Sequence, residues 1–452
     1  MTRRQAITAI GAGAVAVAAV GAGLYFSAPP PPSGPTTTAA TSAPGKISIL
    51  GFTGALGDPL IPVIDAFKAR TGVDVEYVRL GYDELFEKTT TIMKAQSTDF
   101  DVVFSDDPFI PKLASEGWLV PLPEMGLSRD PDVFPALYDI ATFPSPFWPA
   151  PPGFKGKPPT LYAIGFGGGP AVTYGGRTDI ISAAGMNIPT TYQEALAVAQ
   201  KVADPKKPVW GWINRGQKGD PISFDTFPIF WAYGAEMFDQ DWKVIINSPE
   251  ALEALKMLIA LDKTGPPELS TYGPTEVALS FVNGQAAQGN IVPGDIIQDV
   301  EGAQSKSAGK MVYLPTPSGP KGQRSIIGLF CVGVSTYSKK KDTAVDFIKF
   351  WFGREGMRIW VKDGKGLPLR NSFWSDPELT ALPHVKPLVE AVPKMLAGKV
   401  SPYPKTTEWA DIVNIWGSNL NLAITGQLKP EDALSQAASQ LTDSLKRAGY
   451  YG

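Results

Sequence analysis

The sequence predicts an α/β fold with two separate α/β blocks after residue 45. Three observations support this prediction. Strands alternate with amphipathic helices between residues 46 and 117, a glycine cluster follows at Gly165–Pro170, and a second alternation runs to residue 352. Such alternation favours a parallel sheet with helices on both faces. The body is also too long for one core, so two or three domains are expected.

The first block begins directly after residue 45. Its expected strands are 46–51, 73–78 and 100–104, and its expected helices are 58–71, 82–95 and 107–117. Asp58 and Asp107 each precede a proline, so both are expected as N-caps with proline at the first helical position. The segment 121–160 is rich in proline and aromatic residues and predicts an extended wrap.

The rest of the chain continues the alternation. The expected strands are 161–164, 172–174, 311–314 and 326–335, and the expected helices are 191–202, one beginning at Pro249, 277–282 and 343–352. Thr191 and Glu194 form a capping-box pattern, and Ser248 predicts a second N-cap. A mainly helical tail is expected from Pro383 onwards.

The first 45 residues have a different composition. Arg3 and Arg4 precede an apolar run from Ala6 to Ala28, and a stalk rich in Pro, Thr and Ser occupies 29–45. An uncharged run of this length can cross a bilayer, with the arginines on the cytoplasmic side. We expect residues 1–28 to be a membrane anchor or signal segment that places the body outside the cell. Cleavage of this segment and twin-arginine-dependent export both stay open.

The composition excludes several kinds of chemistry. The formal net charge is −3 and no basic run exceeds Lys339–Lys341, whereas nucleic-acid binding requires concentrated positive charge. Cys331 and His384 are the only residues of their types, which excludes an internal disulfide and a zinc site rich in cysteine or histidine. The sequence contains no P-loop and no G-x-S-x-G motif. We expect no cofactor and no metal, and we expect Cys331 in the core.

Seven short motifs occur along the chain in an order that is typical of one protein family. They are Ala66–Val75, Asp101–Leu122, Ala184–Glu194, Ile246–Glu250, Phe281–Ala287, Ala344–Phe352 and Gly426–Leu434. Each motif is short, and the match depends on their number and order over nearly all of 46–446. On these motifs the chain resembles the family-1 extracellular solute-binding proteins of ABC importers, the group that includes maltose-binding protein.

The resemblance implies the two-lobed fold of type II periplasmic binding proteins, with hinge crossings and a ligand cleft between the lobes. The first lobe would contain 46–166 and 317–354, the second would contain 172–312 and 355–452, and the crossings would lie near Gly167 and Pro315. The implied function is the capture of a carbohydrate (a sugar, oligosaccharide or polyol) outside the cell. The implied partners are this ligand and the ABC permease, and the protein would act as a monomer without catalysing a reaction.

The ligand-binding candidates in the first lobe follow from sheet geometry. Ligands of open α/β sheets lie beyond the carboxyl ends of the strands. This rule selects the loops that hold Phe52, Thr53, Tyr82, Asp106 and Asp107. Aromatic rings can cover the C–H face of a sugar, and carboxylates accept hydrogen bonds from its hydroxyls. The resemblance also implies sugar-binding carboxylates at Asp106 and Asp107, with helix capping as the alternative role of Asp107.

The candidates in the second lobe come from segments dense in aromatic residues and from the resemblance. The segments 210–216 and 220–233 contribute Trp212, Arg215 and Trp231. The resemblance adds Asn290 and Trp409. Trp409 aligns with a stacking tryptophan of the family and is expected to be partly exposed in the cleft. For the aromatic candidates, packing in the core is the alternative.

Two other functions stay open. A surface glycosidase could use two carboxylates and needs no histidine. Within the binding class, a peptide or a polyamine is the second choice of ligand. Incubation with oligosaccharides separates a binder from an enzyme, because a binder returns the sugar unchanged.

Overall fold

The computed structural model describes residues 45–54, 57–167, 172–204, 206, 209–397 and 399–451. The predicted membrane segment and nearly all of the predicted stalk lie outside these residues. Among the residues described, no helix combines the length and the hydropathy needed to cross a bilayer.

The first lobe is built on a five-stranded sheet with the order β2-β1-β3-β11-β6. Its strands are β1 (Lys46–Phe52), β2 (Asp74–Leu80), β3 (Val102–Asp106), β6 (Ala163–Phe166) and β11 (Phe330–Val334). The predicted parallel pairing of the first three strands is confirmed, whereas β11 runs antiparallel between β3 and β6. The strand predicted at 326–335 is split, since Ser325–Ile326 forms the separate strand β10.

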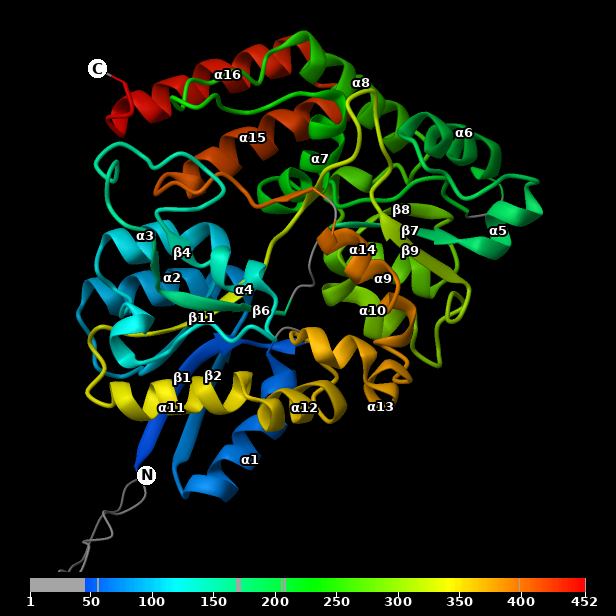
Figure 1. The fold of residues 1–452 in the computed structure, drawn as a ribbon. Helices are drawn as coiled ribbons and strands as arrows, with labels where there is room; N and C mark the ends of the chain where they lie inside the picture. The colour runs from blue at the N-terminus through cyan, green and yellow to red at the C-terminus, as the bar shows by residue number, and fades with distance from the viewer. Residues whose placement is uncertain are drawn as a thin grey trace, which may run out of the picture. The chain divides into compact units, whose positions relative to one another are not determined.

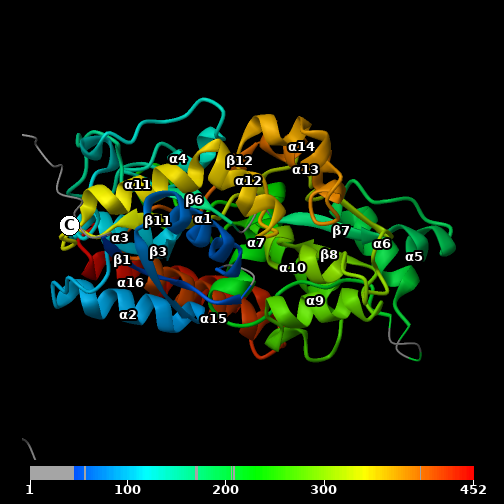
Figure 2. The same cartoon turned by 90° about the horizontal axis from the view of Figure 1, so that it is seen from below.

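Helices cover both faces of this sheet, as predicted. The helices α1 (Ile61–Thr71) and α11 (Lys341–Phe352) pack on one face, and α2 (Tyr82–Lys94) packs on the other (Figure 1 and Figure 2). The short helix α3 (Ile110–Ser115) follows the 3-10 turn η3 (Asp107–Phe109). Cys331 is fully buried in β11, as expected.

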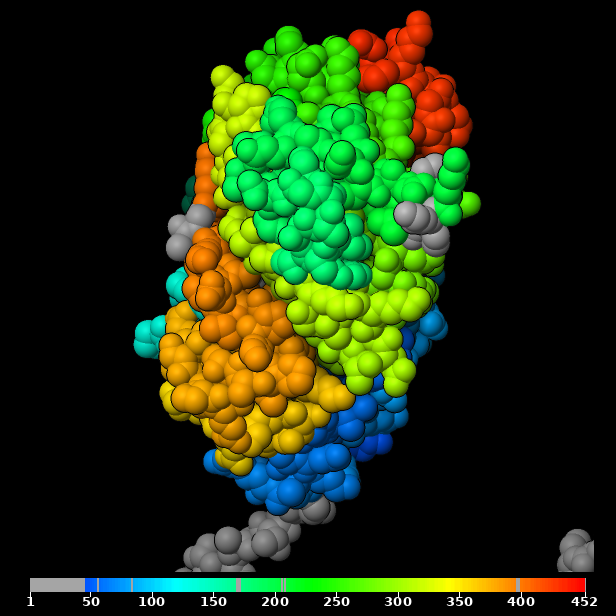
Figure 3. All heavy atoms as spheres, turned by 90° about the vertical axis from the view of Figure 1, so that its right-hand side faces the viewer, coloured from blue at the N-terminus to red at the C-terminus, as the bar shows by residue number. Residues whose placement is uncertain are grey.

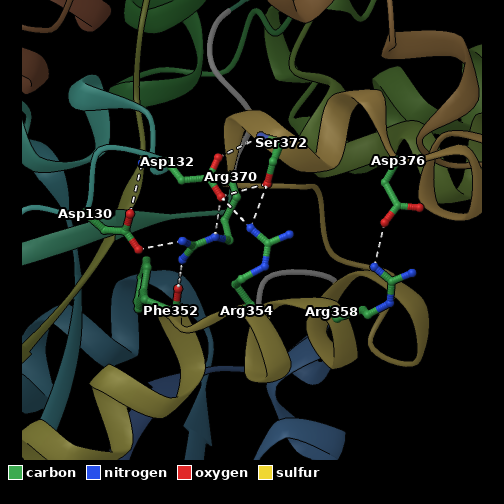
Figure 4. Close-up of polar contacts among 8 residues, drawn as sticks. All are labelled: Asp130, Asp132, Phe352, Arg354, Arg358, Arg370, Ser372 and Asp376. Carbon is green, nitrogen blue, oxygen red and sulfur yellow. Dashed lines mark hydrogen bonds and ion pairs between the residues drawn. The ribbon is translucent and has the colours of Figure 1, made fainter.

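The segment 121–160 wraps the first lobe with few regular elements. These are η4 (Leu122–Met125), α4 (Pro135–Asp139), β4 (Thr142–Phe143) and β5 (Thr160–Leu161). Arg370, which lies far away in the sequence, binds two aspartates of this segment (Figure 4). Its Nε donates to Asp132 at 2.9 Å and its Nη2 donates to Asp130 at 2.5 Å. Its Nη1 donates to the carbonyl oxygen of Phe352 at 2.6 Å. A buried arginine therefore joins the wrap to the end of α11.

The second lobe is built on the three-stranded antiparallel sheet β8-β7-β9. Its strands are β7 (Thr173–Arg177), β8 (Gln288–Ile291) and β9 (Met311–Pro315). Its helices are α5 (Thr178–Ala183), α6 (Tyr192–Val202), α7 (Asp220–Tyr233), α8 (Pro249–Asp262), α9 (Pro274–Val282), α10 (Pro293–Val300), α15 (Trp409–Ile424) and α16 (Pro430–Arg447). The predicted capping box of Thr191 and Glu194 is confirmed, and Ser248 caps α8 as predicted.

The chain passes between the two sheets three times within the described part of the body. It leaves the first sheet after β6, enters the second with β7, and returns between β9 and β11. The predicted lobe boundaries place a third passage directly after residue 354, whereas in the structure it lies later, between residues 362 and 409. β10 and β12 (Val400–Ser401), which belong to the second and third passages, pair in parallel.

The third passage comes later in the chain than expected, because α12 (Arg354–Lys362) still packs against α1 and α11 of the first lobe. Residues from 355 onwards were expected in the second lobe. The buried face of α12 includes Trp360, whose ring centroid lies 6.1 Å from that of Phe166 in β6. The helices α13 (Pro377–Thr380) and α14 (Ala391–Ala397) follow, and α14 contacts β9, where orange spheres meet yellow-green ones in Figure 3.

The two predicted aspartate caps are wrong by one position. Gly57, not Asp58, is the cap residue of the first turn, and Asp58 accepts a hydrogen bond from Arg79 Nη1 at 2.6 Å. Asp106, not Asp107, caps η3, with its Oδ1 accepting from the backbone N–H of Asp107 at 2.8 Å. In both cases the residue before proline has already entered the helical turn.

Candidate functional site

A cavity of about 670 Å³ lies between elements of the two lobes. This volume falls within the range of roughly 300–1,000 Å³ that is usual for small-molecule sites. The first-lobe side chains that line it include Tyr82, Phe86, Asp106, Phe109 and Phe330. From the second lobe and the third passage, the lining includes Arg215, Lys218, Asp220, Phe224, Asp295, Tyr403 and Trp409.

Several helices begin at the wall of this cavity. Tyr82 is the first residue of α2, Asp220 opens α7 and Trp409 opens α15. Asp295 lies in the first turn of α10. Helix N-termini carry partial positive charge and stabilise nearby carboxylates, which accounts in part for the acidic residues at these positions.

The first-lobe wall contains a tyrosine paired with an aspartate. The hydroxyl of Tyr82 donates to Asp106 Oδ2 at 2.6 Å, while Asp106 Oδ1 caps η3. Burial, together with the neighbouring carboxylates of Asp107 and Asp220, raises the pKa of Asp106 well above its ordinary value. The side chain is therefore held in place, and it takes up a proton more readily than an exposed aspartate.

The second-lobe wall repeats this arrangement. The hydroxyl of Tyr403 donates to Asp220 Oδ1 at 2.6 Å, and burial raises the pKa of Asp220. The ring of Tyr403 packs against Trp409, with centroids 4.2 Å apart. Each lobe thus presents one Tyr–Asp pair to the same cavity.

Arg215 is a buried cationic residue in the second-lobe wall. Its Nε and Nη2 donate to Asp225 Oδ1 at 2.9 and 2.5 Å, and its backbone N–H donates to Asp225 Oδ2 at 2.8 Å. Its Nη1 lies 3.8 Å from Asp295 Oδ2, beyond hydrogen-bond distance. Burial raises the pKa of Asp295 to about 6.

Asp107 lies behind the wall of the cavity. Its carboxylate accepts hydrogen bonds from Lys405 Nζ and, at 3.0 Å, from the backbone N–H of Leu329. The exposed fractions of the Asp107 and Lys405 side chains are 0% and 1%. Asp106 rather than Asp107 therefore caps η3. The carboxylate of Asp107 is paired with Lys405, and Asp107 is not among the residues that line the cavity.

Four of the ten predicted site residues meet at the cavity, namely Tyr82, Asp106, Arg215 and Trp409. The expectation that Trp409 is partly exposed is wrong, because its exposed fraction is 1%. Asn290 lies in a small recess beside the cavity, which it lines together with Arg215 and Asp295.

The remaining predicted residues lie away from the lining. Phe52 is buried behind Tyr82, with ring centroids 6.0 Å apart, and Thr53 is exposed. Trp212 is buried and donates to Asn214 Oδ1 at 2.7 Å. Trp231 is also buried, with the Arg324 guanidinium 4.2 Å from its ring centroid. Both tryptophans are thus buried in the core of the second lobe, which was the alternative to a place in the cleft.

Sequence reasoning missed Asp220, Tyr403 and Asp295 as lining residues. The signal for Asp220 was present, because Gly219-Asp220-Pro221 repeats the Asp-Pro helix start already noted at Asp107. Asp295 similarly follows Pro293 at the start of α10. Tyr403 had no comparable signal, since it lies on the third passage, which was expected much earlier in the chain, after residue 354.

The chain is similar to proteins of one family. The family of bacterial extracellular solute-binding proteins matches residues 53–358. A probable amino-acid ABC transporter periplasmic-binding protein of Sinorhizobium fredii is 25% identical over 417 residues, which cover 90% of each chain. The mannitol-binding protein of Pseudomonas aeruginosa is 25% identical over 401 residues, covering 84% of this chain and 88% of that protein.

Solved structures show the same fold. An ABC transporter solute-binding protein of Agrobacterium radiobacter, in complex with ribitol, superposes with a TM-score of 0.77 at 24% identity, covering 88% of this chain and 98% of that one. The predicted two-lobed fold is therefore confirmed. Because the family match spans more than half of the 452 residues, the chain belongs to the bacterial extracellular solute-binding proteins and is the binding component of an ABC importer rather than an enzyme.

Proposed function

We propose that the protein captures a hydroxyl-rich solute, a sugar or polyol, in the cavity and delivers it to the permease of an ABC importer. The observation that carries this proposal is the pair of Tyr–Asp contacts, one from each lobe, in the lining of one aromatic-rich cavity. Carboxylates accept hydrogen bonds from hydroxyls, and aromatic rings cover the apolar C–H face of the same molecule.

The residues proposed to touch the solute are Tyr82, Asp106, Arg215 and Trp409 from the sequence analysis, with Asp220 and Tyr403 added from the cavity. Asp107 and Asn290 would act from behind by holding the wall. Because the contacts come from both lobes, solute binding would favour the closed arrangement of the lobes.

An amino acid is the second candidate ligand, since one relative is a probable amino-acid binding protein. The α-carboxylate of an amino acid requires a free cationic or N–H partner. The guanidinium of Arg215 already donates two hydrogen bonds to Asp225, and the carboxylates of Asp106, Asp220 and Asp295 line the same cavity, so a further anionic group is disfavoured there. The mannitol-binding relative and the ribitol-bound structure favour a polyol.

In this proposal the N-terminal segment holds the body at the outer face of the cell membrane, and the body acts as a monomer. Deleting residues 1–45 should release a folded protein that sediments as one chain and still binds its solute. A truncated body that fails to fold would contradict the anchor-and-stalk arrangement.

The proposed ligand class is tested by thermal unfolding with separate sets of sugars, polyols, amino acids, short peptides and polyamines. A solute at 100 times its dissociation constant should add about 2.7 kcal/mol to the free energy of unfolding. Hits are then titrated calorimetrically and recovered for mass spectrometry, where the solute should be unchanged. Binding confined to amino acids or peptides would overturn the proposal.

A further inference from the structure

The cavity contains more carboxylate than its own cations neutralise. Asp106, Asp220 and Asp295 line it, and the cationic lining residues are Arg215 and Lys218. Arg215 is already paired with Asp225. Within the part of the chain that the structure describes, neither Asp106 nor Asp220 forms an ion pair with a lysine or arginine; their partners are tyrosine hydroxyls and one backbone N–H.

Two buried oxygen atoms beside the cavity also lack a donor among the described residues. Asn290 Oδ1 and Asp295 Oδ1 have no hydrogen-bond partner. Both residues line the recess that shares Arg215 with the main cavity. Asn290 is 3% exposed, and its Nδ2 is fixed by donation to the backbone oxygen of Asp225 at 3.0 Å. The recess, of about 10 Å³, therefore adds two oxygen acceptors to the acidic side of the cavity without offering room for the solute itself.

The helix N-termini at the wall compensate this charge only in part. A helix end carries about half an elementary charge, and its effect falls off within one turn. A carboxylate removed from water loses far more hydration energy than such an end returns. Burial raises the pKa of Asp106 and of Asp220, so the ionised form of either carboxylate is unfavourable without a positive partner. A cationic ligand would supply that partner.

The aromatic lining suits the same kind of ligand. The rings of Phe86 and Phe109 lie 3.8 Å apart at the first-lobe wall, and those of Tyr403 and Trp409 lie 4.2 Å apart at the other. The faces of such rings attract ammonium groups as well as apolar C–H surfaces. Carboxylates and aromatic faces together are the groups that recognise alkylammonium ions.

Building on the proposed function, we infer that the solute carries a basic nitrogen as well as hydroxyls, so that the preferred class is an amino sugar or an aminated polyol. The nitrogen would lie between Asp106 and Asp220, one carboxylate from each lobe. A zwitterion fits less well, because its carboxylate would lie among the carboxylates of Asp106, Asp220 and Asp295.

The experiment compares matched solutes by calorimetric titration at pH 7. The pairs are D-glucitol with 1-amino-1-deoxy-D-glucitol, D-mannitol with 1-amino-1-deoxy-D-mannitol, and D-glucose with D-glucosamine. N-acetyl-D-glucosamine keeps the nitrogen substituent of D-glucosamine but lacks its positive charge. We expect the aminated member of at least one pair to bind about tenfold tighter than its neutral partner, which one added ion pair can supply, and acetylation to abolish the gain.

Variants tie this preference to the two carboxylates. Asp220→Asn should weaken binding of the amine by more than binding of its neutral partner, so that the preference for the amine falls to less than about twofold, since the amide keeps the shape but not the charge. Asp106→Asn provides the same test from the other lobe in case one variant fails to fold.

Each outcome of the comparison decides one question. Neutral solutes that bind as tightly as their amines would overturn the inference and leave the proposed function standing. Binding confined to simple diamines or amino acids would overturn the proposed function. If no member of any set raises the unfolding temperature, both fall.

Discussion

Two buried arginines occupy opposite kinds of surroundings in this protein. Arg370 is 4% exposed and Arg215 is 7% exposed. Arg370 donates from Nε, Nη1 and Nη2 to three different acceptors (Figure 4). Arg215 donates from Nε and Nη2 to a single oxygen of Asp225, and its Nη1 makes no hydrogen bond with the described residues.

The difference separates a structural ion pair from a site. Each guanidinium nitrogen of Arg370 donates a hydrogen bond that joins the wrap, at Asp130 and Asp132, to the end of α11, and Arg370 is absent from the cavity lining. Arg215 and its neighbour Asp295 keep a free donor and a free acceptor beside a cavity. Unused hydrogen-bonding capacity next to a cavity, rather than burial or charge alone, therefore distinguishes the site.

The largest expected effect follows from removing Arg370. Arg370→Met should lower the free energy of unfolding by about 3–5 kcal/mol, because Asp132 loses its buried partner and the Phe352 carbonyl loses its donor. The affinity for the solute should stay within about twofold, since Arg370 is absent from the cavity lining. Chemical denaturation and calorimetric titration measure the two quantities.

Arg215→Met is the matched variant. It should also destabilise the protein, because the side chain of Asp225 is only 1% exposed, but it should in addition weaken solute binding. Equal losses of affinity in the two variants would remove the distinction between the two arginines.

The second effect concerns pH and sharpens the same comparison through Asp295. Burial raises the pKa of Asp295 from 3.8 to about 6, so the folded protein holds this proton more tightly than the unfolded chain. Its stabilising contribution is complete below about pH 4 and is lost as the pH rises through 6. The loss is at most about 3 kcal/mol for a shift of this size.

Asp295→Asn cannot titrate and serves as the reference. The free energy of unfolding of the wild-type protein, relative to this variant, should fall between pH 4 and pH 7. A difference that stays constant over this interval would show that Asp295 titrates as an ordinary exposed aspartate.

Much of the fold could be predicted from local patterns. The alternation at 46–117 gave the parallel pairing of β1, β2 and β3, and the cap at Ser248 and the capping box at Thr191 were read directly. These features depend on residues a few positions apart. The placement of α12 depends instead on Trp360 packing near Phe166, a contact between distant parts of the sequence, so the third passage was expected too early in the chain.

The same limit explains the site. Tyr82 and Asp106 could be selected because the ends of parallel strands converge at one edge of a sheet. Tyr403 could not, since its position follows from the third passage. Trp212, Trp231 and Trp409 are all buried tryptophans of the second lobe, and only Trp409 lines the cavity. The packing of the lobe, which the local sequence does not show, decides which ring reaches the cavity.

A smaller effect is expected from the hydroxyls of the two Tyr–Asp pairs. Tyr82→Phe and Tyr403→Phe each remove one hydrogen bond to a cavity carboxylate. We expect each variant to weaken solute binding by about 1 kcal/mol, or roughly fivefold. Tyr233→Phe is the control, because Tyr233 accepts a hydrogen bond from Gln193 at 3.1 Å and does not line the cavity. A control that weakens binding equally would assign the effect to general loosening of the second lobe.

The smallest effect tests a contact between the lobes that lies outside the cavity. Trp148, on the first-lobe wrap, stacks on Trp242 of the second lobe with centroids 5.9 Å apart, and its Nε1 donates to the carbonyl oxygen of Pro402 at 3.2 Å. Trp148→Phe keeps a ring and loses the hydrogen bond. If this bond forms only when the lobes are closed, its loss of about 0.5–1 kcal/mol should appear as a two- to fivefold weaker affinity.

The control for Trp148 is Trp374→Phe, because the indole N–H of Trp374 has no partner among the described residues and its removal breaks no hydrogen bond. X-ray scattering of the Trp148 variant without solute should also show a slightly larger radius of gyration than the wild-type protein. Unchanged affinity and scattering would mean that the wrap merely rests on the second lobe, and that closure depends on the cavity contacts alone.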